Sequence, residues 1–406
     1  MKSEEMAPHQ DEGQKEHGED AVPPNIKLEI IDLSSEALAC ADRREKARQQ
    51  IINSFSTLGF CQVSGMNDYS AEALLQGSKW FFDDVSEQTK LDQIGTKAYN
   101  PSNKNSYRGY FPAQHDRMSC KEGYDVGLQW EIPDHLKDIP LVEQTPMLHI
   151  PGQEKEVEHY YEVLFRHRDN VRGVGDTIMS LIAEAGGERT DYFKRMFSEF
   201  AQHTLRPIRY PQRVGEVPKD AILPSGRVIS TPAHADSGFL TFLQTFDYPG
   251  LELLVDDKWY AVPPNPETLI VNVGEQLSEM SNGRFAATVH RVMDIGKSRF
   301  SMPFFYEPGA DADINTKIPA SLLPPETEDK FDRSYYPYVT FLFFKLPIYA
   351  EYSHVSDNIP ESIYKKYIEN YEPKECWATK TAIQVDGATF MQRKLKAKYR
   401  ETFSKS

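Results

Sequence analysis

The fold class is decided by seven short runs that follow one another between residues 204 and 308: TLRPIRY (204–210), FLTFLQTF (239–246), LELLV (251–255), KWYAV (258–262), TLIVNV (268–273), ATVHRV (287–292) and RFSMPFFY (299–306). Each run is rich in β-branched or aromatic residues, and Pro, Gly, Asn and Asp separate the runs. Many short strands at close spacing predict a sandwich or barrel. We therefore expect a mainly β protein.

Helices are predicted on both sides of this β-rich region. Residues 154–185 have apolar side chains at helical spacing, and Gly186-Gly187 ends that helix. The other expected elements are strands at 26–34 and 60–65, a helix from Ser34 or Ser35 to Gly59, helical stretches at 70–92 and 360–404, and an ordered loop region at 93–153. These helices would flank the β core.

Four segments follow from this pattern. Residues 1–24 are polar and acidic, so they are expected to form a disordered tail. Residues 25–200 form an N-terminal region of helices and strands, 201–350 the β core, and 351–406 the C-terminal helices.

The overall charge and the cysteines limit the partners. The net charge of −15 over 406 residues argues against nucleic-acid binding. The four cysteines form no close pair, which favours a reducing compartment over a disulfide framework. The first residues resemble no signal peptide, and the apolar runs are too short to span a bilayer. We expect a cytoplasmic monomer that acts on a small molecule, without nucleic-acid or membrane partners.

Three residues form a candidate metal site. His234 and Asp236 are two positions apart, so in an extended segment they point to the same side. His290 follows 54 residues after Asp236. Two histidines and one carboxylate leave three positions open on an octahedral metal, an arrangement that suits iron(II). Zinc is the competing metal, and an H-x-D triplet by itself also occurs by chance.

A second pair strengthens this interpretation. Arg299 and Ser301 share one face if RFSMPFF is a strand. A guanidinium and a hydroxyl together can bind a carboxylate through paired hydrogen bonds. The alternative for an isolated strand arginine is a solvent-facing charge, but the combination of all five residues is specific.

With these residues the sequence resembles the isopenicillin N synthase-like family of iron(II)/2-oxoglutarate-dependent dioxygenases. The resemblance covers roughly residues 26–350 and is carried by HADSGFLTFL (234–243), LIVNVGEQLSEMSNGRFAATVHRV (269–292) and RFSMPFF (299–305). It implies a double-stranded β-helix (jelly-roll) core. The segments IIDLSSEALAC (30–40) and INSFSTLGFCQVSG (52–65) resemble the N-terminal region of these enzymes.

The resemblance also implies roles for the site residues. His234, Asp236 and His290 would be the catalytic iron ligands, with 2-oxoglutarate and O2 as cosubstrates. Arg299 and Ser301 would bind the far carboxylate of 2-oxoglutarate. The enzyme would oxidise a C–H bond by hydroxylation, desaturation, demethylation or cyclisation, releasing succinate and CO2.

Two positions depart from the family pattern. Ile208 stands in PIRYP where many plant members have Asn, and Glu275 stands where Asp is commoner. Tyr210 is a candidate contact to 2-oxoglutarate, and a packed strand aromatic is the alternative. Two other functions remain open: an oxidase that uses no 2-oxoglutarate, like isopenicillin N synthase, and a non-catalytic binding protein of the same fold.

One loop offers candidate residues for binding the substrate. The loop NSYRGYFP (105–112) places Tyr107, Arg108 and Tyr110 close together, as a candidate pocket mouth for an acidic small molecule. The alternative is that Arg108 ties a long loop to the core.

Overall fold

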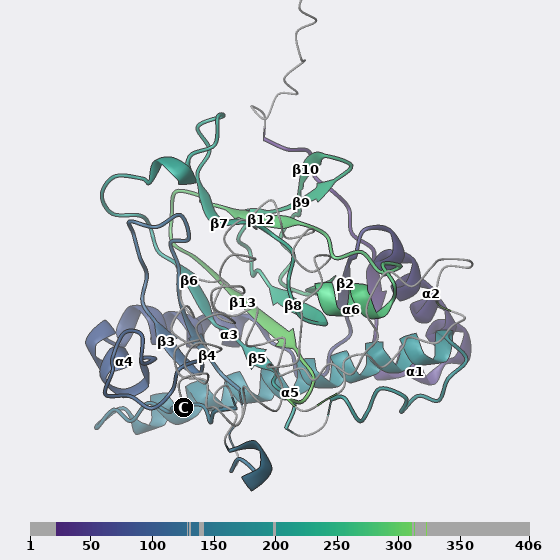
Figure 1. The fold of residues 1–406 in the computed structure, drawn as a ribbon, viewed down its shortest axis with the longest axis horizontal. Helices are drawn as coiled ribbons and strands as arrows, with labels where there is room; N and C mark the ends of the chain where they lie inside the picture. Colours follow the sequence, from purple (N-terminus) through teal and green to yellow (C-terminus); the bar gives the residue numbers. More distant parts are fainter. Residues whose placement is uncertain are drawn as a thin grey trace, which may run out of the picture.

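Two β-sheets form the centre of the molecule (Figure 1). The computed structural model describes residues 22–127, 129, 131–137, 142–197, 200–310, 312 and 322. The nine-stranded sheet has, in spatial order, β1 (Ile30–Asp32), β2 (Phe60–Ser64), β11 (Leu269–Val273), β8 (Leu240–Gln244), β13 (Arg299–Tyr306), β6 (Ile208–Tyr210), β4 (Glu122–Asp125) and β3 (Gly109–Phe111), with β5 (Thr204–Leu205) also paired to β13. The four-stranded sheet has the order β10 (Lys258–Ala261), β9 (Leu251–Val255), β12 (His290–Met293) and β7 (Ile229–His234).

The alternation of side chains along the strands gives the nine-stranded sheet two different faces. Its outer face lies in the main hydrophobic core, to which β13 contributes Phe300, Met302, Phe304 and Tyr306. Its inner face meets the four-stranded sheet through small apolar clusters, in which Phe60 and Ile270 pack with Leu253. The intervening residues of β13, which include Arg299 and Ser301, therefore belong to the inner face between the two sheets.

Helices cover the outer face of the nine-stranded sheet. Their bounds are α1 (Ser35–Ala39), α2 (Ala41–Thr57), α3 (Ala71–Lys79), α4 (Glu87–Ile94), α5 (Glu154–Ala185) and α6 (Glu275–Met280), with short helical turns at Trp80–Asp84, Asp134–Leu136 and Lys219–Ala221. The long helix α5 runs beneath the sheet in Figure 1 and packs against β13. Gly175 of α5 allows this close approach, because a Cβ there would lie 2.5 Å from the Tyr306 ring.

The predicted fold class is confirmed, since each of the seven β runs contains a strand and helices flank the sheets. The helix at 154–185 is also confirmed. The single helix expected from Ser34 or Ser35 to Gly59 is instead two helices, α1 and α2, because the backbone is extended at Cys40 between them. Ser34 caps α1, and Gly59 has the positive φ of +66° expected after a helix. Among the described residues, no helix combines the length and the low polarity that crossing a membrane requires.

Two further local predictions were wrong. The stretch 70–92 is not one helix: α3 ends at Lys79, and a single π-helical turn follows. Ser86 then caps the separate helix α4 by accepting a hydrogen bond from the Thr89 amide. The region 93–153 was expected to be loop, but it contains β3 and β4. These strands are short, and β4 is held by pairing with β6, which lies more than 80 residues later.

Parts of the predicted segments lie outside the described residues. They are the acidic tail up to residue 21, most of 311–350 and the C-terminal helices at 351–406. The four-segment division of the chain remains a proposal.

Candidate functional site

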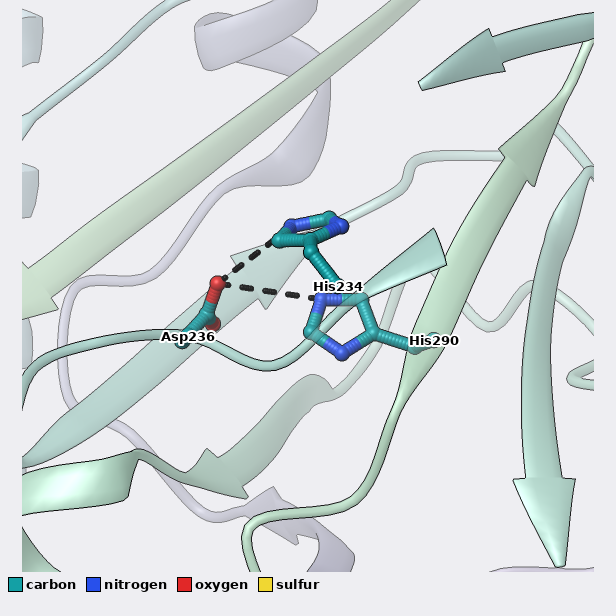
Figure 2. Close-up of side chains that lie close together, drawn as sticks. All are labelled: His234, Asp236 and His290. Carbon is teal, nitrogen blue, oxygen red and sulfur yellow. Dashed lines mark ion pairs between the residues drawn. The ribbon is translucent and has the colours of Figure 1, made fainter. Parts of the chain in front are cut away.

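The structure brings His234, Asp236 and His290 together between the two sheets (Figure 2). His234 ends β7 and His290 begins β12, and the two residues are direct cross-strand partners. Asp236 lies in the turn that leads from β7 to β8. Its Oδ1 atom is 3.6 Å from His234 Nε2 and 3.7 Å from His290 Nε2. One ligand atom from each residue lies within 4.8 Å of the others, so the three can share one metal ion.

The histidine rings are oriented for metal binding. His234 Nδ1 is 2.8 Å from the carbonyl oxygen of Pro232, and His290 Nδ1 is 3.1 Å from that of Thr288. A carbonyl oxygen can only accept, so each Nδ1 carries the donated hydrogen and each Nε2 presents a lone pair. Burial and the neighbouring His234 lower the pKa of His290 to about 4, which keeps its ring neutral near pH 7.

Asp236 is held as a carboxylate. Burial alone would raise its pKa, but the two imidazoles and the Thr241 hydroxyl outweigh burial and lower the pKa. Its backbone carbonyl accepts a 2.7 Å hydrogen bond from the amide of Glu275, the first residue of α6. Two imidazole nitrogens and one carboxylate oxygen are a donor set that fits iron(II), the metal that the resemblance implies.

Arg299 and Tyr210 form the second part of the site. They are cross-strand partners on β13 and β6, and the Arg299 Cζ atom lies 4.5 Å from the centroid of the Tyr210 ring. Arg299 is only 2% exposed, and within the described part of the chain its Nε and Nη1 atoms have no hydrogen-bond partner. A buried guanidinium with unused donors is costly unless it binds an anion. Ser301, also buried, lies two residues further along the same face of β13.

Tyr210 lies between Arg299 and the strand that carries His290. It packs with Val292, which lies two residues after His290 on β12. Burial, the largest single effect, would raise the pKa of Tyr210, but the Arg299 guanidinium, Lys121 and two neighbouring hydroxyls together outweigh burial and lower the pKa. One of these hydroxyls belongs to Ser301. The other belongs to Thr231 of β7, which no motif includes; its buried Oγ1 atom makes no hydrogen bond within the described part of the chain.

The three substrate candidates are buried. The Tyr110 hydroxyl donates to Glu122 Oε2 at 2.6 Å, and the Tyr107 hydroxyl is 3.2 Å from Thr204 Oγ1. Arg108 donates to the Thr204 hydroxyl and, at 3.1 Å, to the carbonyl of Gln202. These contacts match the alternative stated for Arg108, an arginine that ties its loop to the core.

Comparison with known proteins gives the same family as the motifs. The family model described as the 2OG-Fe(II) oxygenase superfamily matches residues 207–308. The Arabidopsis thaliana protein DOWNY MILDEW RESISTANCE 6 is 33% identical over 316 residues, which cover 74% of this chain and 79% of the relative. Isopenicillin N synthase from Streptomyces jumonjinensis is 26% identical over 307 residues, covering 73% of this chain and 89% of that enzyme.

A solved structure shares the fold. A full-length Neurospora crassa protein, crystallised in complex with alpha-KG, superposes with a TM-score of 0.59 at 21% identity, covering 75% of this chain and 91% of the Neurospora chain. The jelly-roll core that the resemblance implied is thereby confirmed.

Proposed function

Because this chain belongs to the 2OG-Fe(II) oxygenase superfamily, we propose that His234, Asp236 and His290 bind its iron(II) and that Arg299 anchors its 2-oxoglutarate. The enzyme is an oxidoreductase of the dioxygenase class that uses Fe(II), 2-oxoglutarate and O2. When bound, iron and 2-oxoglutarate together supply the activation of O2 and the oxidation of a substrate C–H bond, with release of succinate and CO2.

The protein's own residues supply orientation and charge. The two imidazole Nε2 atoms and Asp236 Oδ1 offer three ligands on one side of the ion, which leaves the other side for cosubstrates. The guanidinium of Arg299 would donate to the far carboxylate of 2-oxoglutarate, and the Ser301 hydroxyl would add a hydrogen bond. The Tyr210 side chain, which lies beside Arg299, would border the same carboxylate. Phe60, whose ring centroid is 5.6 Å from that of His290, forms an apolar wall beside the cluster.

The observation that carries this proposal is the unsatisfied buried charge of Arg299. Its donors face the inner side of β13 beside Tyr210, and Tyr210 packs against the strand that holds His290. No carboxylate of the described residues pairs with Arg299. A dicarboxylate that also reaches the metal would supply the missing partner.

Succinate formation tests the function. Purified protein loaded with Fe(II) would be supplied with 2-oxoglutarate, O2 and a panel of small amino acids, alkaloids and phenolics. We expect one succinate for each molecule of oxidised product. A product formed without succinate would contradict the role of 2-oxoglutarate.

A second candidate is an iron-dependent oxidase that needs no 2-oxoglutarate. The similarity to isopenicillin N synthase favours it, as does Ile208, which stands where many plant members have Asn. In that enzyme type Arg299 and Ser301 would hold a carboxylate of the primary substrate. The succinate measurement separates the two candidates, because such an oxidase releases none.

We further propose a setting for the reaction. A net charge of −15 and widely spaced cysteines support a cytoplasmic enzyme without nucleic-acid or membrane partners. The substrate is proposed to be a small molecule of secondary metabolism, and the active form a monomer. Light scattering and cell fractionation test the monomer and the compartment.

A further inference from the structure

The two carboxylate oxygens of Asp236 have different environments. Oδ1 faces His234 and His290. Oδ2 points away from them and accepts two hydrogen bonds, from Thr241 Oγ1 at 2.5 Å and from Asn272 Nδ2 at 2.8 Å. A carboxylate oxygen has two lone pairs in its plane, so these two donors satisfy Oδ2 completely. Only Oδ1 is left for a metal ion.

The two donors come from rigid positions. Thr241 and Asn272 are cross-strand partners on β8 and β11, which are neighbouring inner strands of the nine-stranded sheet. Both side chains are buried, at 5% and 2% exposure. Both lie on the inner face, since their neighbours in sequence belong to the main core on the outer face. The pair therefore ties the turn that carries Asp236 to one sheet, while both histidines belong to the other.

We propose that Thr241 and Asn272 are positioning residues that reserve Oδ1 of Asp236 for the metal and keep this carboxylate a one-oxygen ligand. The inference rests on the proposed function, because it concerns the same metal. A carboxylate that bound through both oxygens would occupy one of the three positions that 2-oxoglutarate and O2 need. Hydrogen bonds to the unused oxygen prevent this and hold the ligand at the correct angle.

Metal affinity of the apoprotein tests the proposal. Co(II) binding would be measured anaerobically by calorimetry for the wild type and for Thr241→Val and Asn272→Ala, each of which removes one donor. We expect each variant to bind Co(II) about 10- to 100-fold more weakly. The visible absorption of the bound Co(II) should also change, because the carboxylate is free to turn.

Two control variants give the comparison. Thr241→Ser keeps the hydroxyl and should bind Co(II) like the wild type. Thr268→Val removes another buried hydroxyl, which donates to Gln62 Oε1 at 3.2 Å and does not touch Asp236, and it should also leave the affinity unchanged. Thermal unfolding of each apoprotein shows whether the fold is intact.

The outcomes are distinguishable. If the wild type binds no divalent metal, the proposed function itself fails. If the wild type binds Co(II) and the Thr241→Val and Asn272→Ala variants bind it equally well, only the positioning role is overturned. Loss of the apo fold in both variants would assign these side chains to folding and would overturn the proposal as well.

Discussion

His234 and His290 face each other across the paired strands β7 and β12, with ring centroids 4.3 Å apart. Strand register brings them together, although 56 residues separate them in sequence. The register between the two strands shifts immediately after this pair, between His290 and Val292. The three candidate ligands therefore lie at the end of this strand pair, where both imidazoles are close to the turn that carries Asp236.

Removing the carboxylate should abolish metal binding. Asp236→Ala leaves only the two imidazole ligands, and we expect affinity for Fe(II) to fall by more than about 100-fold, since changes at residues that merely support a ligand already cost about 10- to 100-fold. Iron-dependent turnover should be lost with it. Calorimetry with Fe(II) checks the affinity. Asp191→Ala, at an exposed carboxylate that pairs with Arg189, is the control; equal iron binding in the two variants would refute the metal site.

Removing the buried guanidinium should weaken 2-oxoglutarate binding. Truncating one partner of a buried charge pair costs about 2 kcal/mol or more, so Arg299→Ala should raise the KM for 2-oxoglutarate at least about 30-fold. Steady-state kinetics with varied 2-oxoglutarate checks this. Arg166→Ala, at an exposed arginine paired with Glu162, should leave the KM unchanged. A change confined to the affinity for the primary substrate would instead favour the oxidase that uses no 2-oxoglutarate.

Replacement by alanine should change the free energy of unfolding differently at two glycines of helix α5. Gly175→Ala places a Cβ 2.5 Å from the Tyr306 ring, and such overpacking costs about 1–3 kcal/mol of the free energy of unfolding. A Cβ at Gly173 would have nothing within 4 Å, so Gly173→Ala should be neutral or stabilise the helix by about 0.5–1 kcal/mol. Urea unfolding of both variants checks the difference. Equal stabilities would show that α5 does not pack tightly on β13.

Much of this arrangement follows from the sequence. Alternation along RFSMPFFY predicted that Arg299 and Ser301 share a face. In the structure they lie on the inner face of the sheet, whereas Phe300 and Met302 lie on the outer face, in the main core. His234, Asp236 and His290 could be singled out because the family motifs contain them, and the structure brings their side chains together. The long helix α5 was found because its apolar stripe is long enough to be unambiguous.

Other parts could not be predicted locally. Thr241 and Asn272 occupy ordinary strand positions, and their role depends on the β8–β11 register, which short motifs do not encode. The strands β3 and β4 are only three and four residues long, and long-range pairing stabilises them. The burial of Arg108 likewise depends on Gln202 and Thr204, more than 90 residues away.

The buried His167 on α5 should make stability depend on pH. Burial lowers the pKa of His167 from 6.5 to about 4, so between these values the unfolded chain binds the proton more readily than the folded protein. The free energy of unfolding therefore carries no penalty from His167 above pH 6.5. It falls as the pH drops from 6.5 to 4, by roughly 3 kcal/mol in total. Urea unfolding from pH 7 to pH 4 should show a smaller loss of stability in His167→Leu. Identical pH dependence in the variant and the wild type would contradict the assignment.

An anaerobic difference spectrum shows whether one site of the protein holds iron(II) and 2-oxoglutarate together. Fe(II) is added to the apoprotein, followed by 2-oxoglutarate. We predict a weak visible charge-transfer band in the wild type, a band that requires much more 2-oxoglutarate in Arg299→Ala, and none in Asp236→Ala. A wild-type protein that binds iron but shows no such band at saturating 2-oxoglutarate would show that the two do not bind in one site.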